Sequence, residues 1–349
     1  PDLDINFYEY YRESCNKLKK LLNTKEDVLI LDGEGILGLE AACASLIEAG
    51  DRILCIDNGI FGHGFGDFAK IYGAEVVYFK GDYRKAVDVD ELEKFLEKDN
   101  EFKLATLVHC ETPSGITNPV DKICPLLRKH GIISIVDSVS AIGGERVEVD
   151  KWQMDIVLGG SQKCLSAAPG LTFLSISEEA WNIIENRQTP IASFYCNLGI
   201  WKNYYEDKWF PYTQPISDIY GLNCALDRIL EKGDYIERHN KIANGVRKAL
   251  KQAGLELYPL DGYSNTVTTV LIPEEISFDE IFNSMLEDHN IMIAGAFDYL
   301  KDKVIRIGHM GENCYEDKMY ITLKALDNVL KKHGIKLNGS LHKYFVDFM

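Results

Sequence analysis

The sequence of 349 residues lacks the features that mark membrane-spanning, exported and disulfide-bonded proteins. No apolar run approaches the roughly 18 residues that a membrane span requires, and no basic stretch followed by an apolar segment opens the chain. The nine cysteines are scattered and include no Cys-x-x-Cys pair, so neither a disulfide framework nor a zinc knuckle is indicated. These absences predict a cytoplasmic protein that is neither exported nor embedded in a membrane.

Positive charge is also scarce. The chain has 38 lysines and arginines against 54 aspartates and glutamates, a formal charge of -16 that is spread along the sequence. This balance argues against nucleic acid or an anionic membrane surface as a partner, and small molecules are the expected ligands. With 46% hydrophobic residues, the chain can bury a large core, and its length favours two domains.

Hydrophobic periodicity predicts an α/β domain followed by a smaller one. Apolar residues spaced by three and four between Phe7 and Leu22 predict an amphipathic helix. Short, continuously apolar runs then alternate with helical stretches, which is typical of a mainly parallel sheet covered on both faces. These predicted strands begin near residues 28, 52, 74, 104, 132, 155 and 171.

From about residue 217 the pattern changes to two long helices, at 217–233 and 235–254. Strands near 266 and 304 and closing helices at 277–289 and 314–333 follow. We expect a large domain over 1–232 and a smaller α+β domain over 233–349.

Unusual residues follow four of the predicted strands. Gly33 and Gly35 follow the first and would leave free N–H groups at a helix start, where a phosphate can bind. Thr112, Asp137 and Lys163 follow three later strands. Because ligands of open α/β sheets bind outside the carboxyl ends of the strands, we expect these residues to share one site.

Each of these residues alone is commonly structural, but together they match the needs of pyridoxal 5'-phosphate. The aldehyde of this cofactor needs a lysine for a Schiff base, its ring nitrogen needs an acid, and its phosphate needs N–H and hydroxyl donors. The long side chain of Lys163 stands in the cramped run SQKCLSAAPG, as expected for a lysine held against a cofactor. Lys163 and Asp137 are therefore the predicted catalytic pair.

Several motifs resemble those of the class V aminotransferases, in particular the alanine-glyoxylate and serine-pyruvate branch. GSQKCLSAAPG and VDSVSAIGG are similar to the lysine and aspartate motifs of that branch. NGIFG at 58–62 looks like its ring-stacking segment and HCETPSG at 109–115 like its hydroxyl-donor turn. PYTQP at 211–215 and VIRIGHMG at 304–311 resemble its intersubunit and substrate-binding segments, so the resemblance runs to about residue 333.

The resemblance implies the fold of PLP-dependent aminotransferases (fold type I) and a homodimer whose active site is shared between subunits. It implies Phe61 over the pyridine face and Arg306 on the substrate carboxylate. The expected contacts of the rest of the cofactor are Gly35, Ile36, Gln162 and Thr213 at the phosphate, the last from the partner subunit, and Thr112 with Val139 around the ring.

The implied reaction moves the amino group of a small amino acid, of alanine or serine type, to a 2-oxo acid such as glyoxylate or pyruvate. Lys163 would carry the proton between the substrate α-carbon and C4' of the cofactor, and Asp137 would keep the ring cationic. Two half-reactions with the amino group held on the cofactor predict ping-pong kinetics.

Three positions depart from the family pattern. Glu34 stands where a small hydroxyl residue is common beside the phosphate, and a charged carboxylate there would repel that group. Our hypothesis is that Glu34 lines the donor pocket and biases specificity. Phe210 replaces a tyrosine that often accompanies the intersubunit threonine, and the chain begins, at Pro1, after the family's Pro-Gly-Pro arm.

Other residues favour structural interpretations. His109, Cys110 and Glu111 mimic a metal cluster, but adjacent strand residues point to opposite faces, so we predict no metal site. Cys164 is expected to be a small buried residue and His63 a solvated loop histidine.

Several alternative functions remain open on the sequence. A cysteine desulfurase or related lyase would use the same lysine, but such enzymes resemble Ser-x-His-Lys, whereas this chain has Ser161-Gln162-Lys163. A 2-aminoethylphosphonate aminotransferase differs only in what Arg306 and its pocket prefer. A catalytically inactive binding protein on this fold is disfavoured because the lysine and the aspartate are both present.

A nicotinamide dehydrogenase is the alternative from a different class. The stretch GEGILG at 33–38 satisfies G-x-G-x-x-G, and Asp57 ends the next strand. This interpretation leaves Lys163, Asp137 and Arg306 unexplained.

Overall fold

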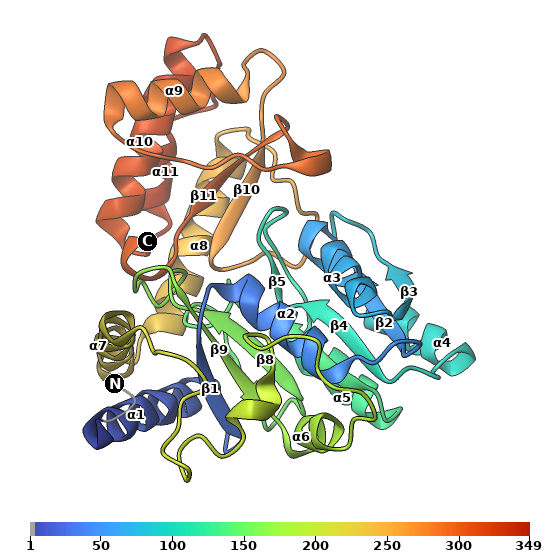
Figure 1. The fold of residues 1–349 in the computed structure, drawn as a ribbon. Helices are drawn as coiled ribbons and strands as arrows, with labels where there is room; N and C mark the ends of the chain where they lie inside the picture. Colours follow the sequence, from blue (N-terminus) through green and yellow to red (C-terminus); the bar gives the residue numbers. More distant parts are fainter. Residues whose placement is uncertain (1–3) are drawn as a thin grey trace.

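The computed structural model describes residues 4–349, and Figure 1 shows two bodies of unequal size. The larger one is built on a seven-stranded sheet with the order β1-β9-β8-β7-β4-β2-β3. Its strands are β1 (Asp27–Asp32), β2 (Arg52–Asp57), β3 (Glu75–Lys80), β4 (Leu104–Val108), β7 (Ile133–Asp137), β8 (Ile156–Gly160) and β9 (Leu171–Ile176).

Strand direction brings the candidate residues to one edge of this sheet. The pairs from β3 through β8 are parallel, whereas β9 pairs antiparallel with both β8 and β1. Because two reversals restore the direction, β1 runs parallel to β8. The carboxyl ends of β1, β4, β7 and β8 therefore lie at the same edge.

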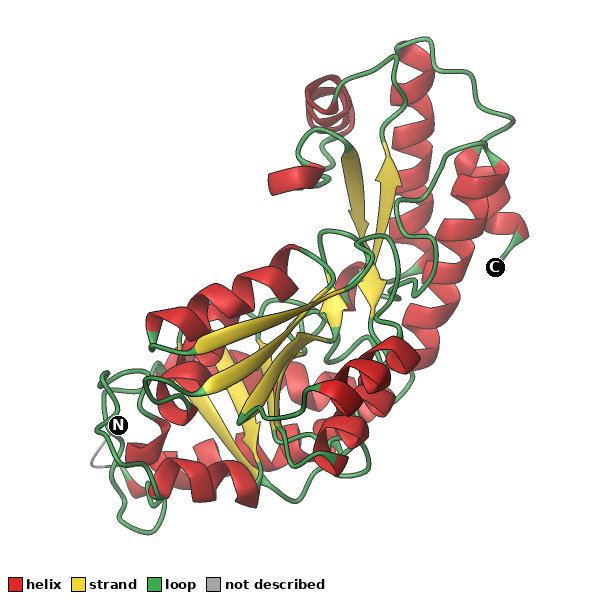
Figure 2. Ribbon diagram, turned by 90° about the vertical axis from the view of Figure 1, so that its right-hand side faces the viewer, coloured by secondary structure: helices red, strands yellow, loops and turns green. Residues whose placement is uncertain are grey.

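Helices cover both faces of the sheet, as Figure 2 shows. This double cover explains the continuously buried strands: all five residues of β4 and all six of β9 are buried. The helices of the large body are α1 (Ile5–Leu22), α2 (Gly35–Leu46), α3 (Ile60–Ile71), α4 (Val89–Lys98), α5 (Val120–Lys129), α6 (Glu178–Glu185) and α7 (Ile216–Lys232).

The smaller body packs helices against the antiparallel pair β10–β11. Its elements are α8 (Tyr235–Gln252), β10 (Val267–Leu271), α9 (Phe278–His289), β11 (Val304–Gly308), α10 (Glu316–Lys332) and α11 (Leu341–Asp347). Sequence signals mark some of these ends clearly; Ser277 and Glu280 form a reciprocal capping box at the start of α9. The main core of the large body ends at Ile229 and that of the small body begins at Ile242.

Two elements were absent from the sequence interpretation. Strands β5 (Cys110–Glu111) and β6 (Ile116–Thr117) form a two-stranded hairpin that holds Thr112 in its turn, and α11 closes the chain. Both are too short for periodicity to reveal. Within residues 4–349, no helix combines the length and apolarity needed to cross a bilayer.

Candidate active site

A cavity of about 290 Å³ at the carboxyl edge of the sheet gathers nine of the eleven predicted site residues. Elements far apart in the sequence contribute to it, as expected for the shared edge of parallel strands. The nine residues are Glu34, Gly35, Ile36, Phe61, Thr112, Asp137, Val139, Gln162 and Lys163.

Asp137, the last residue of β7, lines this cavity. The backbone N–H of Val139 donates to Oδ1 at 2.9 Å and orients the group. Burial raises the pKa of Asp137 to about 6, against the opposing effects of this hydrogen bond and of the Lys163 charge. Such a carboxylate, held in a desolvated cavity, is suited to pair with a cationic ring nitrogen.

Lys163 follows β8 in a loop that is closed by its own hydrogen bonds. The Ser161 hydroxyl donates to the carbonyl of Ala168 at 2.6 Å, and the N–H of Ala167 donates to the carbonyl of Ser161 at 3.0 Å. The N–H of Ser166 donates to the carbonyl of Lys163 at 3.0 Å. The small residues noted in the sequence thus form a tight turn that fixes the backbone beneath the lysine.

The start of α2 forms one end of the cavity. The first backbone N–H groups of a helix have no intrahelical acceptor, and Gly35 and Ile36 occupy these positions. A Cβ atom at position 35 would lie 2.6 Å from Cγ2 of Val139, so only glycine lets the backbone approach this closely. These N–H groups and the positive end of the helix create an anion-binding end of the cavity.

Phe61 is placed by a buried carboxylate that the sequence interpretation did not assign to the site. Glu111 is fully buried, and its two oxygens accept hydrogen bonds from the N–H groups of Phe61 and Gly62, at 3.0 and 2.9 Å. It thereby caps α3, whose own N-cap residue is Gly59. Burial raises the pKa of Glu111 to about 7. The available sequence signal was a carboxylate directly after the apolar run at 104–110.

Thr112 lies where two cavities meet. Its hydroxyl hydrogen-bonds the Ser140 hydroxyl at 2.6 Å, and Thr112 and Lys163 line both the first cavity and a second one of about 650 Å³. Arg306, on β11, lines this second cavity; its Nε donates to the carbonyl of Gly295 at 2.6 Å. The two Nη nitrogens have no hydrogen-bond or ion-pair partner among residues 4–349, so they can bind a carboxylate bidentately in the cavity that Arg306 and Lys163 share.

The class V aminotransferase family model matches residues 1–295. The chain belongs to the class V aminotransferases. It is 35% identical over 332 residues to an uncharacterized aminotransferase of Methanocaldococcus jannaschii, covering 94% of this chain and 86% of that protein. It is 33% identical over 343 residues to a pyridoxamine–pyruvate transaminase of Mesorhizobium japonicum, covering 96% and 87%.

The structure resembles that of the ureidoglycine–glyoxylate aminotransferase from Bacillus subtilis, with a TM-score of 0.95 and 31% identity. The match covers 99% of this chain and 91% of that one. The fold is therefore that of the PLP-dependent aminotransferases, as predicted, and the family membership decides against the dehydrogenase alternative.

The surroundings of Asp57 also argue against a dehydrogenase. Its buried carboxylate is bonded by its own chain on both oxygens, to Nδ1 of His63 at 2.9 Å and to the Tyr83 hydroxyl at 2.7 Å. It is therefore not free for a ribose. The expectation of a loop histidine was wrong, because His63 lies within α3, one turn after the helix begins.

Class V aminotransferases depend on PLP, and the side chains of the first cavity fit its ring. Lys163 and Asp137 are present in one cavity with the Phe61 ring, and the Gln162 Oε1 is buried without a hydrogen-bond partner among the described residues. An orphaned buried polar atom is costly unless a ligand satisfies it. The residues that would hold the ring are thus assembled in the chain itself.

Two residues from the sequence interpretation lie outside the first cavity. Thr213 is exposed and lines neither cavity. Phe210 is buried in the core, stacked on Tyr8 at 4.4 Å, so its replacement of a tyrosine does not remove a hydroxyl from this cavity. Pro1 lies outside the described residues.

The His109, Cys110 and Glu111 side chains have separate surroundings. His109 Nδ1 hydrogen-bonds the Ser138 hydroxyl at 3.2 Å, and Cys110 lines the cavity, whereas Glu111 caps α3. Among residues 4–349, no group of three or more His, Cys, Asp or Glu side chains is placed to hold a metal ion.

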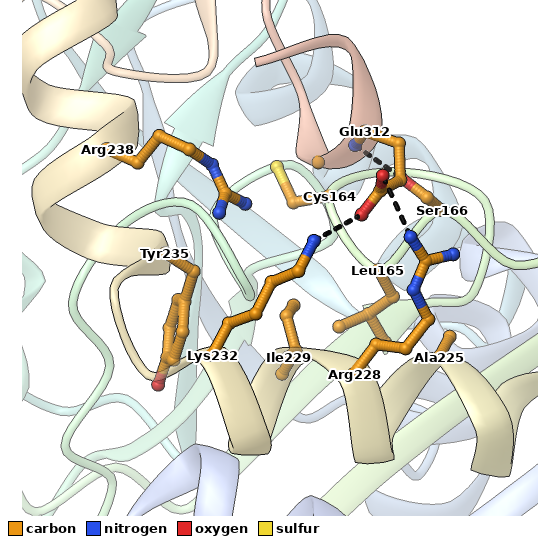
Figure 3. A pocket seen from close by; sticks show the side chains of 11 residues that line it. Cys164, Leu165, Ser166, Ala225, Arg228, Ile229, Lys232, Tyr235, Arg238 and Glu312 are labelled. Atoms are coloured by element: carbon orange, nitrogen blue, oxygen red, sulfur yellow. Dashed lines mark hydrogen bonds and ion pairs between the residues drawn. The ribbon is translucent and has the colours of Figure 1, made fainter. Parts of the chain in front are cut away.

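Behind the lysine loop, a contact joins the two bodies of the molecule (Figure 3). Arg228 and Lys232 of α7 reach Glu312 of the small body, at 3.0 and 3.6 Å. The adjacent Gly311 has a φ of +53°, and a Cβ there would lie 2.4 Å from the carbonyl oxygen of Cys164. The segment that follows the Arg306 strand therefore packs directly against the residue next to Lys163.

Proposed function

We propose that this aminotransferase moves the amino group of a small amino acid, of alanine or serine type, to glyoxylate or pyruvate. The supporting observation is that Lys163, Asp137 and Phe61 share one cavity, while Lys163 and Arg306 share the adjoining one. Two of the relatives named above use pyruvate or glyoxylate according to their names. An arginine beside the lysine suits the α-carboxylate that amino acids and 2-oxo acids have in common.

Each residue has a distinct proposed role. PLP, when bound, supplies an electron sink and stores the amino group between the half-reactions. Asp137 holds the proton on the ring nitrogen, and Phe61 provides a flat apolar wall. The free amine of Lys163 removes the proton from the substrate α-carbon and delivers it to the cofactor side, while Arg306 fixes the carboxylate so that this carbon faces the amine.

The visible absorption spectrum tests this proposal. Addition of L-alanine or L-serine should bleach the band of the bound cofactor, and addition of glyoxylate or pyruvate should restore it. Lys163→Ala should abolish turnover. A full-length protein that shows no cofactor band after incubation with excess PLP, and no amino transfer, would contradict the proposal.

We also propose a homodimer in which Thr213 binds the phosphate in the partner's site, since Thr213 is exposed and lines neither of the two cavities described above. Mixing Lys163→Ala with Thr213→Ala subunits tests this assignment. If Thr213 acts across the interface, a hybrid contains one intact site and activity rises on mixing. If it acts within its own subunit, no hybrid site is intact and activity does not recover.

Two further proposals concern organisation and location. The separate cores support domains over 1–232 and 233–349. The nine cysteines, all free and eight of them buried, support a reducing cytoplasmic location.

A second candidate reaction is the one named for the Mesorhizobium relative, between pyridoxamine and pyruvate. The observation that favours it is the carboxylate of Glu34, which lines the first cavity next to Gly35 and Ile36.

A further inference from the structure

We infer that Glu34 makes this site select the unphosphorylated form of the pyridoxal ring, with a 5'-hydroxymethyl group, as a substrate that is exchanged in each turnover. The inference rests on the second candidate reaction above and concerns the anion-binding end of the cavity. It assigns to Glu34 the discrimination between a hydroxyl and a phosphate ester.

Glu34 lies at the end of the cavity where a phosphate would bind. Glu34 is the N-cap residue of α2, and its side chain makes no capping hydrogen bond to the helix. It lines the cavity together with Gly35 and Ile36, the residues whose N–H groups would otherwise face a phosphate. In residues 4–349, no lysine, arginine or histidine forms an ion pair with Glu34 within 4.0 Å. Its carboxylate is therefore uncompensated within the chain.

The charges on the cavity wall also disfavour a phosphate. The wall holds two carboxylates, Glu34 and Asp137, and one cation, Lys163. A phosphate ester would add about two negative charges beside Glu34, and like charges at close range repel. A hydroxyl instead donates a charge-assisted hydrogen bond to a carboxylate without adding charge.

The apolar part of the wall favours the same ligand. Leu39, Phe65 and Phe68 line the cavity, and desolvating a doubly charged group against such side chains is unfavourable. The orphaned Oε1 of Gln162 adds a second hydrogen-bond acceptor to the cavity. Acceptors and apolar side chains together suit a ring that carries an uncharged hydroxymethyl group in place of a phosphate ester.

The inferred reaction balances without an additional oxidant. The C4'–N bond of pyridoxamine breaks and a C–N bond forms at C2 of the 2-oxo acid. The C4' carbon is oxidised to the aldehyde of pyridoxal, and the 2-oxo carbon is reduced to the amine carbon by the same two electrons. The oxygen that leaves the 2-oxo acid as water is matched by the water oxygen that enters the aldehyde, and Lys163 transfers the proton between the two carbons.

Covalent trapping on the full-length protein tests which ring form the site accepts. The protein is incubated with increasing pyridoxal or PLP and reduced with borohydride, and the adduct on Lys163 is quantified by peptide mass. We expect wild type to be half-labelled at a pyridoxal concentration at least about tenfold below that of PLP. Glu34→Ser should be half-labelled at a lower concentration of PLP than of pyridoxal. Glu34→Gln, which removes only the charge, should be half-labelled at similar concentrations of the two.

The matched control is Asp67→Asn, because Asp67 is an exposed carboxylate on α3 that pairs with Lys70, outside the cavity. It should leave both concentrations unchanged. Preferential labelling of wild type by PLP, with the same preference in Glu34→Ser, would overturn the inference.

A kinetic measurement separates this inference from the general proposal. Conversion of pyridoxamine and pyruvate to free pyridoxal and alanine supports the inference. If the PLP-loaded protein instead transfers amino groups between alanine and glyoxylate and leaves pyridoxamine unconsumed, the inference fails while the aminotransferase proposal stands. Absence of both reactions would contradict the two together.

Discussion

The buried carboxylate of Glu111 accepts a hydrogen bond of 3.0 Å from the backbone N–H of Phe61, the residue expected to stack on the cofactor ring. A second bond, from Gly62 at 2.9 Å, completes the cap of α3. The orientation of the ring wall thus depends on an ionisable group that lies outside the cavity lining. This relationship makes the position of Phe61 sensitive to substitutions on the β5–β6 hairpin.

Glu111 should make folding stability depend on pH. Its pKa in the folded protein, about 7, lies above its ordinary value of 4.5, so the folded state binds the proton more tightly. The free energy of unfolding of wild type, relative to Glu111→Gln, should therefore fall as pH rises from about 5 to 8, by up to about 3 kcal/mol. Urea unfolding at both pH values measures this difference. Glu93→Gln, at an exposed ion pair with Lys129, should show no such trend.

Asp137 should set the acid limb of the activity profile. Its pKa of about 6 means that the carboxylate is increasingly protonated below that pH and no longer stabilises a cationic ring nitrogen. We expect kcat/KM to fall as the pH drops through about 6. Asp137→Asn should lower kcat/KM by about 100-fold or more and remove this limb. An acid limb that persists in Asp137→Asn would assign it to another group.

Arg306→Lys should weaken substrate binding more than turnover. A lysine cannot both keep the bond to the Gly295 carbonyl and present two N–H groups to a carboxylate. We expect KM for the amino acid to rise by about 10- to 100-fold, equivalent to about 1.4 to 3 kcal/mol, with a smaller change in kcat. Arg146→Lys, at a residue whose side chain is 70% exposed, is the control in the same steady-state assay. An unchanged KM would remove Arg306 from substrate binding.

Gly311→Ala should disturb the lysine loop from the small body. The added Cβ would lie 2.1 Å from the Ser166 hydroxyl oxygen and 2.4 Å from the Cys164 carbonyl oxygen, at a left-handed φ of +53°. We expect a loss of about 1–3 kcal/mol in unfolding free energy together with a lower kcat. Gly131→Ala is the matched control, because Gly131 also has a left-handed φ, of +71°, and nothing lies within 4 Å of its Cβ. If both substitutions lowered the unfolding free energy and kcat equally, the effect of Gly311→Ala would not arise from its contact with the lysine loop.

Much of the fold and part of the site were predictable from local sequence. Continuously apolar runs gave the strands because a doubly covered sheet buries both faces of each one, and the three- and four-residue spacing gave the long helices. The carboxyl-edge rule, together with family motifs, assembled nine site residues, including Lys163 and Asp137. Such features are readable because they depend on periodicity and on where a strand ends.

Other features depend on contacts between segments far apart in the chain, and local sequence patterns do not predict such contacts. In the sequence, Glu111 stood out only as part of a His-Cys-Glu run that resembles a metal site. In the structure, its carboxylate caps α3 by accepting a hydrogen bond from Phe61, which is 50 residues away in the sequence. His63 is exposed, as expected, but it lies in α3 and bonds Asp57. Phe210 was interpreted as a site residue, whereas it packs against Tyr8 in the core.

The sequence by itself thus determined the class of fold, the lysine and aspartate of the site and the unusual glutamate at position 34. Only the tertiary structure decided which side chains face the cavity, which carboxylates are buried and already bonded, and that Glu34 is not. The reason is physical: periodicity reports how much of an element is buried, whereas hydrogen-bond partners and pKa shifts arise from neighbours that only folding brings together.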